Sequence, residues 1–292
     1  MTFEGLFTAI VTPFDKNMRI NESALRDFVD FQIENGVDGL VPVGTTGESA
    51  TLTPEEHKKV VEIVIDQVDG RVKVLAGTGS NSTDEALDYT KHAKDAGADA
   101  ALMISPYYNK PTQEGLYQHF KFIAEKVDIP IILYTVPGRT AVNINPETTQ
   151  RLSKIKNIVG IKDASGSLEQ VTKEIELCGK NFVVLSGEDA LNYPIMCLGG
   201  KGAISVISNV APKLTSELIH AALDGKFERA RELHYKLFAL SKVMFIETSP
   251  GPVKEALNMM GFKAGKPRLP LVPVSRENAG KIRAVLKDLK LV

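Results

Sequence analysis

Eight short apolar runs recur along the first three-quarters of the chain, and a stretch with helical spacing follows each of them. Successive runs begin roughly 20 to 35 residues apart, which is the length of one strand–helix unit. Most of the runs are apolar throughout, as parallel strands covered on both faces should be. The predicted strands are residues 6–13, 39–44, 73–79, 101–108, 130–137, 159–165, 183–189 and 202–209.

Helix-capping residues stand between these runs. Asn21 precedes the first predicted helix, which runs to Gly36. Residues 53–56, Thr-Pro-Glu-Glu, form a capping box with proline at the first helical position. Residues 82–85 predict a second capping box, and that helix ends at Gly97. Later boundaries are marked by Asn145, Ser167, Asp224 and Gly225.

Eight alternating units predict an α/β fold, the (β/α)8 or TIM barrel, over residues 1–225. A doubly wound sheet is the alternative, but it usually has fewer strands, and no G-x-G-x-x-G follows the first strand here. Beyond residue 225 only helical spacing occurs, in 227–245, 252–260 and 276–289. We therefore expect residues 226–292 to form a small C-terminal helical extension of the barrel.

The overall composition excludes several classes of partner. The 292 residues carry 35 basic and 36 acidic side chains, without the positive excess that nucleic acids or anionic membranes attract. No apolar run approaches the roughly 20 residues of a membrane helix. The N-terminus lacks a signal-peptide pattern, so we expect a cytoplasmic protein. Cys178 and Cys197 are expected to be free buried thiols, in preference to a disulfide or a metal site.

Polar and glycine-rich segments follow the predicted strands. In a (β/α)8 barrel the carboxyl ends of the strands meet at one face, where the chemistry of such proteins is located. Any one segment alone could be an ordinary turn or loop, but their shared position predicts a functional mouth. The segments are residues 44–48 (Gly-Thr-Thr-Gly-Glu), 77–79, 106–111 (Pro-Tyr-Tyr-Asn-Lys-Pro), 134–140 and 186–189.

Lys162 is a single charge within the apolar strand 159–165. Side chains alternate along a strand, so Gly160 and Lys162 should share one face while Val159 and Ile161 share the other. The β-branched pair suits packing against outer helices, which turns Lys162 towards the barrel interior. Removal from water favours the uncharged amine, a nucleophile that forms Schiff bases with carbonyl compounds. A lysine that reaches solvent at the barrel rim is the alternative.

The histidines argue against metal chemistry. All five lie in predicted helices and none at a strand end, so we expect no metal site and no cofactor. They are His57, His92, His119, His220 and His234.

Tyrosines are the remaining candidate proton carriers. Tyr134 lies on the strand next to Lys162, Tyr107 and Tyr108 lie one strand further on, and Thr45 could complete a hydroxyl relay. Arg139 offers a planar guanidinium to a substrate carboxylate. These residues predict a metal-free, lysine-dependent enzyme that acts on a carbon–carbon bond of a carboxylated carbonyl compound.

Over essentially its whole length the chain resembles the dihydrodipicolinate synthase family of the pyruvate-dependent aldolases and lyases. Residues 44–48 and 160–165 are shared across that superfamily, whereas Tyr-Tyr-Asn-Lys-Pro together with Val-Pro-Gly-Arg-Thr is more specific to the synthases. Segments 186–189 and 246–255 also match. The resemblance implies condensation of pyruvate with L-aspartate 4-semialdehyde to 4-hydroxy-tetrahydrodipicolinate, the first committed step of the diaminopimelate and lysine pathway. It also implies a homotetramer built as a dimer of dimers.

The resemblance assigns a role to each matched residue. Lys162 would form the Schiff base with pyruvate, and Thr45 and Thr46 would hold the pyruvate carboxylate. Tyr134, Thr45 and Tyr108 would form the proton relay, with Tyr108 supplied by a neighbouring subunit.

Further residues would contact the second substrate or the backbone around it. Arg139 would receive the carboxylate of the aldehyde, and Gly187 and Ile204 would contribute backbone contacts. Thr135 stands where the family usually has asparagine. It lies on the opposite face of the strand from Tyr134, so we expect altered local hydrogen bonds and no loss of chemistry.

Some members of the family are inhibited by L-lysine at a dimer interface. The residues that match that site are Ser49, Ala50, His57, Asn81, Glu85 and Tyr107. Pro54 replaces a histidine found in some of those members, so inhibition by L-lysine is a hypothesis.

Two other functions are compatible with parts of the pattern. Sibling enzymes such as N-acetylneuraminate lyase or a 2-keto-3-deoxy-sugar-acid aldolase keep the lysine, the tyrosine and the Gly-Thr-Thr-Gly-Glu segment, but not the arginine. Arg139 argues against them. A barrel recruited as a non-enzymatic binding protein is disfavoured by the full set of Lys162, Tyr134, Tyr108 and Arg139.

Overall fold

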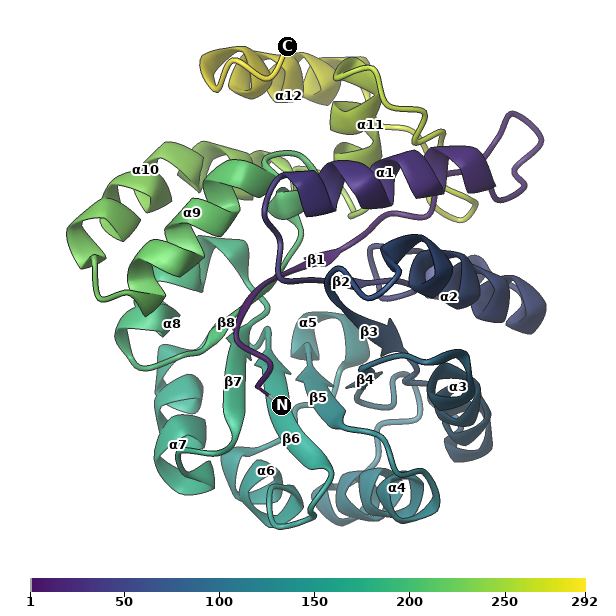
Figure 1. Cartoon of the computed structure of the whole chain (residues 1–292), viewed down its shortest axis with the longest axis vertical. Coiled ribbons are helices and arrows are strands. Elements are labelled where there is room, and N and C mark those ends of the chain that lie inside the picture. The colour runs from purple at the N-terminus through teal and green to yellow at the C-terminus, as the bar shows by residue number, and fades with distance from the viewer. Residues whose placement is uncertain (1) are drawn as a thin grey trace.

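The computed structural model describes residues 2–292 and contains a closed barrel of eight parallel strands (Figure 1). Strand β8 pairs with β1, with Gly5 opposite Gly202, and this pairing closes the barrel. The fold class predicted from the sequence is therefore confirmed. The strands are β1 (Gly5–Ala9), β2 (Gly39–Val41), β3 (Lys73–Gly77), β4 (Ala100–Ile104), β5 (Ile131–Thr135), β6 (Ile158–Asp163), β7 (Val183–Ser186) and β8 (Gly202–Ser205).

All eight strands lie where the apolar runs predicted them, but most end several residues earlier. The run 6–13, for example, leaves the sheet after Ala9. The remaining apolar residues continue into the loops at the carboxyl ends, where they are still buried. Hydrophobicity alone does not separate a buried loop from a strand, which is why the predicted ends are too long.

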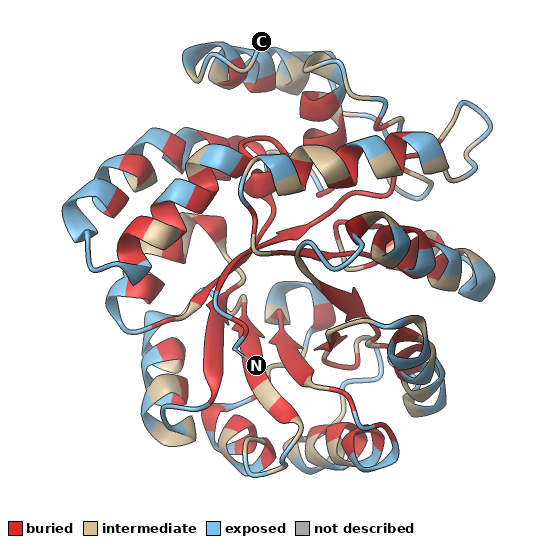
Figure 2. Cartoon of the chain, in the orientation of Figure 1, coloured by how far each residue is buried: buried red, intermediate tan, exposed pale blue. Residues whose placement is uncertain are grey.

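Helices surround the barrel, with their polar faces outward and their apolar faces on the strands (Figure 2). The barrel helices are α1 (Glu22–Glu34), α2 (Pro54–Val68), α3 (Thr83–Ala96), α4 (Gln113–Lys126), α5 (Pro137–Thr140), α6 (Pro146–Leu152), α7 (Leu168–Cys178), α8 (Asn192–Cys197) and α9 (Pro212–Leu223). Short 3-10 turns occur at η1 (Ser49–Thr51), η2 (Asp189–Leu191) and η3 (Ile207–Asn209). The C-terminal helices are α10 (Phe227–Val243), α11 (Gly251–Met259) and α12 (Arg276–Asp288).

The predicted caps are present with two corrections. Asn145 precedes α6, but its side chain makes no capping hydrogen bond. The Asn21 side chain accepts a hydrogen bond from Ala24 N, and the Thr53 capping box has both of its hydrogen bonds. Ser82 accepts from the backbone N–H of Glu85, but the Glu85 carboxylate accepts from the Ser80 hydroxyl and does not return to the Ser82 N–H. The second box is thus only half formed, because Ser80 competes for the glutamate.

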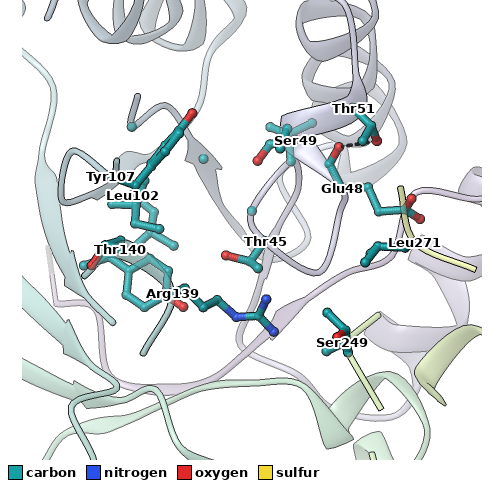
Figure 3. A pocket seen from close by; sticks show the side chains of 18 of the residues that line it. Thr45, Glu48, Ser49, Thr51, Leu102, Tyr107, Arg139, Thr140, Ser249 and Leu271 are labelled. Atoms are coloured by element: carbon teal, nitrogen blue, oxygen red, sulfur yellow. Dashed lines mark hydrogen bonds between the residues drawn. The ribbon is translucent and has the colours of Figure 1, made fainter. Parts of the chain in front are cut away.

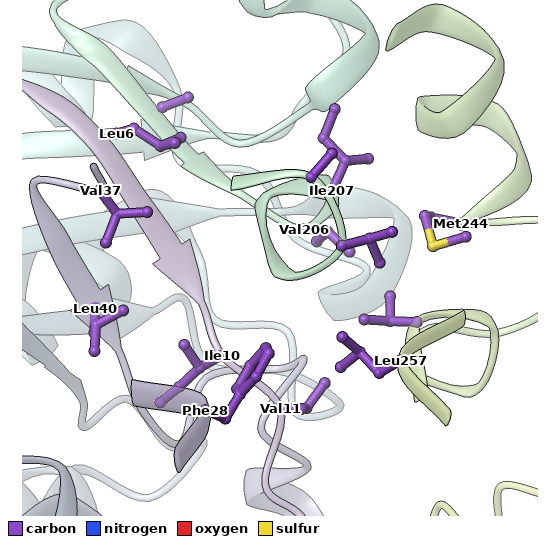
Figure 4. Packing of buried hydrophobic residues seen from close by; sticks show 14 of the residues in the cluster. Leu6, Ile10, Val11, Phe28, Val37, Leu40, Val206, Ile207, Met244 and Leu257 are labelled. Atoms are coloured by element: carbon purple, nitrogen blue, oxygen red, sulfur yellow. The ribbon is translucent and has the colours of Figure 1, made fainter. Parts of the chain in front are cut away.

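The C-terminal helices share a hydrophobic core with the barrel. Met244 and Leu257 pack in one cluster with Val11, Val206 and Ile207 (Figure 4). A second layer fills the barrel itself. It is made of inward-facing side chains such as Phe7, Val41, Leu75, Ile132 and Leu185. The division of the chain at residue 225 stays a prediction, and Met1 of the predicted barrel segment lies outside the described residues.

Two further expectations concern membrane helices and the two cysteines. Within residues 2–292 no helix is long and apolar enough to cross a membrane. Both cysteines are free thiols, as predicted, but they are not buried as expected: Cys178 is half-buried and Cys197 is exposed. Cys197 is the last residue of the short helix α8, so its side chain faces outward.

Candidate active site

The loops at the carboxyl ends of the strands enclose a cavity of about 830 Å³. It brings together most of the predicted site residues, from β2, β5, β6 and β7. These are Thr45, Thr46, Tyr134, Arg139, Lys162 and Gly187. An adjoining cavity of about 290 Å³ shares three of them: Thr45, Tyr134 and Arg139.

Lys162 lies inside the barrel, with only 5% of its surface exposed. Its Nζ is 4.3 Å from the centre of the Tyr134 ring. The two residues are register partners on adjacent strands β5 and β6, so the sheet itself sets their approach. The alternative of a lysine that reaches solvent at the rim is therefore wrong.

The inward and outward alternation of side chains expected along β6 fails at one residue. Ile161 faces the outer helices as predicted, but Val159 packs against the filling of the barrel. The pairing of β5 with β6 shifts register here: Ile131 pairs with Ile158, and Ile132 with Gly160. This irregularity adds one residue to β6 and turns Val159 inward, while Lys162 keeps its predicted direction.

Gly187 leaves room for the lysine side chain. A Cβ at this position would lie 3.0 Å from Lys162 Cε and 2.8 Å from Ala164 Cβ. Any larger residue would displace the amine or the loop after β7. The glycine is therefore a steric requirement of the site.

A chain of buried hydrogen bonds runs behind β5 and β6. Thr135 Oγ1 donates to Asn143 Oδ1 (2.8 Å) and accepts from Ile144 N (3.1 Å). Asn143 Nδ2 donates to Gln170 Oε1 (2.6 Å), and Gln170 Nε2 donates to Asp163 Oδ2 (2.8 Å). Because Thr135 and Asp163 directly follow Tyr134 and Lys162, this chain ties the two strands together just behind the site.

The same network contains a second buried carboxyl group, Glu174 of α7. Burial and then the charge of Asp163 raise the pKa of Glu174 to about 9, and burial also raises the pKa of Asp163. Within residues 2–292 the buried Oε2 of Glu174 has no hydrogen-bond partner, as expected of an oxygen that carries a proton itself. Glu174 therefore keeps its proton near neutral pH, beside the carboxyl group of Asp163.

Glu48 and Lys254 form a buried ion pair beside the cavity. Glu48 Oε1 lies 2.5 Å from Lys254 Nζ, with both side chains 1% exposed, and Glu48 Oε2 accepts from Arg268 N (2.8 Å). Burial lowers the pKa of Lys254 to about 8, and Glu48 partly opposes that shift. Lys254 Nζ (4.1 Å) and Arg268 Cζ (4.3 Å) both lie close to the centre of the Phe14 ring.

This pair fastens the C-terminal extension to the Thr45–Glu48 turn. Leu271, which follows Arg268, lines the smaller cavity together with Thr45 and Glu48 (Figure 3). The sequence reasoning assigned no role to Lys254. The available signal was a lysine at an otherwise apolar face of the helix that begins at Gly251.

Arg139 is the unpaired cation of the site. It lies on α5, is exposed, and its guanidinium forms no ion pair or side-chain hydrogen bond within residues 2–292. Figure 3 shows it extending into the space between Thr45 and Ser249. An unpaired guanidinium at a cavity wall is suited to a carboxylate ligand.

Two predicted residues do not line the cavity of their own chain. Tyr108 is 89% exposed, with a left-handed backbone (φ 73°), and Ile204 is buried in the filling of the barrel. Conversely, the sequence reasoning missed several residues that do line it. These are Glu188 after β7 and Phe245, Glu247, Thr248 and Ser249 after α10.

The residues of the hypothetical lysine site are divided. Ser49, Ala50 and Tyr107 line the smaller cavity, and burial followed by the charge of Glu85 raises the pKa of Tyr107. His57 stacks on the Tyr89 ring at 4.0 Å, and burial lowers the pKa of His57 to about 4.

Asn81 and Glu85 lie on the adjoining loop and helix. The backbone carbonyl of Asn81 accepts from Asn109 Nδ2 (2.9 Å). Glu85, in the first turn of α3, accepts from the Ser80 hydroxyl.

No metal centre is formed by the described part of the chain. Among residues 2–292 no three His, Cys, Asp or Glu side chains are grouped so that they could hold a metal ion.

Comparison with known proteins places this architecture among enzymes of one kind. The model of the dihydrodipicolinate synthetase family matches residues 2–289. The 4-hydroxy-tetrahydrodipicolinate synthase of Syntrophobacter fumaroxidans is 55% identical, over 99% of this chain and 100% of that protein. The enzyme of the same name from Syntrophus aciditrophicus is 57% identical, over 99% of each chain.

The similar solved structures are likewise dihydrodipicolinate synthases. The dihydrodipicolinate synthase of Acinetobacter baumannii complexed with pyruvate has a TM-score of 0.98, 45% identity and full coverage of both chains. A monomeric dihydrodipicolinate synthase variant has a TM-score of 0.97 and 46% sequence identity, and the match covers 99% of this chain and 98% of that one. The enzyme of Cyanidioschyzon merolae with lysine bound has a TM-score of 0.97 and 37% sequence identity, and the match covers 99% of each chain.

Glu174→Gln should remove a pH-dependent loss of stability. The pKa of Glu174 rises from 4.5 to about 9 on folding, so the stability that the protonated group contributes is complete below pH 4.5 and is lost as the pH rises towards 9. Glutamine cannot ionise. The advantage of the variant in free energy of unfolding should therefore grow by up to about 1.4 kcal/mol per pH unit across this window.

Thermal unfolding of both proteins between about pH 5 and pH 9 measures this difference. Glu169→Gln, on the exposed face of the same helix, is the matched control and should show no such growth. Parallel pH profiles of stability for the wild type and Glu174→Gln would contradict a buried Glu174 that keeps its proton near neutral pH.

Proposed function

The chain belongs to the dihydrodipicolinate synthetase family, and on that premise we propose that it condenses pyruvate with L-aspartate 4-semialdehyde to give 4-hydroxy-tetrahydrodipicolinate. It is a Schiff-base lyase of the diaminopimelate and lysine pathway. Relatives of that name match nearly the whole length of the chain at more than half identity. The observation that carries the proposal is the buried amine of Lys162 in a cavity beside Tyr134.

We propose that Lys162 is the nucleophile. Its neutral Nζ attacks the keto carbon of pyruvate, water leaves, and the resulting imine loses a methyl proton to become an enamine. The enamine carbon then attacks the aldehyde carbon of the second substrate. Finally the amine of that substrate attacks the imine carbon, which closes the ring and releases Lys162.

The proton transfers are assigned to Tyr134, Thr45 and Tyr108. Tyr134 lies against Lys162, and Thr45 lines the same cavity, which supports their part in the relay. Tyr108 points away from its own cavity, and its 89% exposure suits a side chain that enters the site of a neighbouring subunit. The relay therefore requires an oligomer, which we propose is a homotetramer built as a dimer of dimers.

The carboxylates of the two substrates are assigned to different residues of the cavity that contains Lys162. Thr45 and Thr46 would bind the carboxylate of pyruvate, and Arg139 that of the aldehyde. Gly187 and Ile204 would act through their backbones. That role suits Ile204, whose side chain is occupied in the barrel filling.

The sugar-acid aldolases are a weaker interpretation. Their substrates do not call for Arg139, and the curated relatives are named as synthases over the full chain. A cytoplasmic location stays a prediction.

We further propose that L-lysine binds near Tyr107 and Glu85. Ser49, Ala50 and Tyr107 already line one cavity, and Glu85 would meet the ammonium of an amino acid. One similar structure, from Cyanidioschyzon merolae, is described with lysine bound.

Turnover of pyruvate and L-aspartate 4-semialdehyde by the wild type, Lys162→Ala and Arg139→Ala tests the proposed roles. Lys162→Ala should lose nearly all activity, because no other amine can form the imine. Arg139→Ala should lose on the order of 10- to 100-fold in kcat/KM for the aldehyde while it still captures pyruvate, since one charge-assisted contact is removed. Full activity of Lys162→Ala would overturn the mechanism.

Millimolar L-lysine should slow the wild-type enzyme, and D-lysine should have little effect. Glu85→Gln should weaken the inhibition because it removes the carboxylate that faces the ligand's ammonium. Initial rates at fixed substrate measure both effects. Activity unchanged by L-lysine would remove the hypothesis of a feedback site.

A further inference from the structure

Three glutamates line the two adjoining cavities, and two of them already have partners. Glu48 is paired with Lys254 at 2.5 Å. Glu247 Oε1 accepts from Ser275 N (3.0 Å), Ser275 Oγ (2.9 Å) and Asn278 Nδ2 (2.7 Å). Glu188 is different, because within residues 2–292 its carboxylate forms no ion pair, accepts no hydrogen bond from another side chain, and accepts one only from the backbone N–H of Ala190.

Glu188 is half-buried and held in place by its neighbours. The carboxylate of Asp189 accepts from Ser205 Oγ (2.6 Å), Val206 N (2.8 Å) and Ile207 N (2.9 Å), which fixes the loop after β7 against β8. Glu188 therefore stands at the cavity wall on a rigid support. A side chain positioned in this way is suited to recognition of a ligand.

The positive charges around the Glu188 carboxylate do not fully compensate its burial and the negative charge of Asp189. Burial and then the charge of Asp189 raise the pKa of Glu188, and the backbone N–H of Ala190, followed by the charges of Lys242 and Lys162, only partly opposes the shift. A cation bound in the cavity would compensate the lost hydration of the carboxylate. The site thus offers an energetic reason to bind a cationic group next to Glu188.

Arg139 supplies the opposite charge across the same cavity. It follows β5, Glu188 follows β7, and the strand between them, β6, carries Lys162. Two strand spacings separate the loops by about 10 Å, a gap that the long arginine and glutamate side chains can narrow to the size of an amino acid. An unpaired cation and an unpaired anion therefore flank the reactive amine.

We propose that Glu188 binds the α-ammonium group of the second substrate while Arg139 binds its α-carboxylate. This inference rests on the proposed function, in which that substrate is an α-amino acid with an aldehyde at the far end. The paired contacts would orient the aldehyde towards the enamine on Lys162. They would also select an amino acid over an aldehyde acid without the amine, which makes Glu188 a specificity-determining residue.

The test compares L-aspartate 4-semialdehyde with 4-oxobutanoate, which has the same carbon chain without the ammonium. Glu188→Gln should lose on the order of 10- to 100-fold in kcat/KM for the amino acid, as expected for one lost charge-assisted contact. It should lose little in the rate constant for addition of the enamine to 4-oxobutanoate, a compound whose adduct stays on Lys162 because it has no amine to displace the lysine. Its preference between the two aldehydes should fall by the same factor. Glu188→Asp should recover part of that preference, because it restores the charge.

Mass spectrometry measures both reactions, as released product for the amino acid and as the adduct retained on Lys162 for 4-oxobutanoate. Borohydride trapping of pyruvate on the lysine reports whether the first step is intact. Trapping by Glu188→Gln should equal that of the wild type. Glu247→Gln is the matched control, since its carboxylate lies on the same wall but is already hydrogen-bonded, and it should keep the wild-type preference.

Several outcomes would overturn the inference. Rates for the two aldehydes that fall in parallel in Glu188→Gln would show a structural effect only. An unchanged preference in Glu188→Gln, or an equal change in Glu247→Gln, would also contradict it. Failure of the wild type to turn over L-aspartate 4-semialdehyde would instead refute the proposed function itself.

Discussion

A lysine ammonium loses several kcal/mol of hydration when it enters a protein interior without a partner, so the burial of Lys162 is a constraint on the rest of the site. No carboxylate within residues 2–292 forms an ion pair with this amine. Its Nζ lies 4.3 Å from the centre of the Tyr134 ring, and Gly187 leaves the space that the side chain occupies. The cavity, the relay and the substrate contacts are all arranged around that amine.

Two buried networks hold this arrangement from opposite sides. Behind β5 and β6, the chain from Thr135 to Asp163 joins the strands that carry Tyr134 and Lys162. On the other side, the Glu48–Lys254 pair attaches the C-terminal extension to the turn that contains Thr45. Removal of one member of a buried pair leaves an uncompensated charge, so both networks act as rigid supports. The barrel strands alone would not fix the site.

Local patterns predicted the parts of the structure that depend on short stretches of chain. Recurrent apolar runs indicated all eight strands, and the alternation in β6 directed Lys162 inward even though a register shift turned Val159 the wrong way. Contacts between distant segments were missed. Lys254 meets Glu48 from more than 200 residues away, and Glu247 and Ser249 reach the cavity from beyond the barrel. The proposed place of Tyr108 in a neighbouring subunit is of the same kind, because no pattern within one chain can position it.

Reduction with borohydride in the presence of pyruvate, followed by peptide mass mapping, tests the central claim most directly. The account predicts a single reduced pyruvate adduct, located on the peptide that contains Lys162 and absent when either reagent is omitted. An adduct on a different lysine, or no adduct at a pyruvate concentration that supports turnover, would contradict the assignment of the buried amine as the nucleophile.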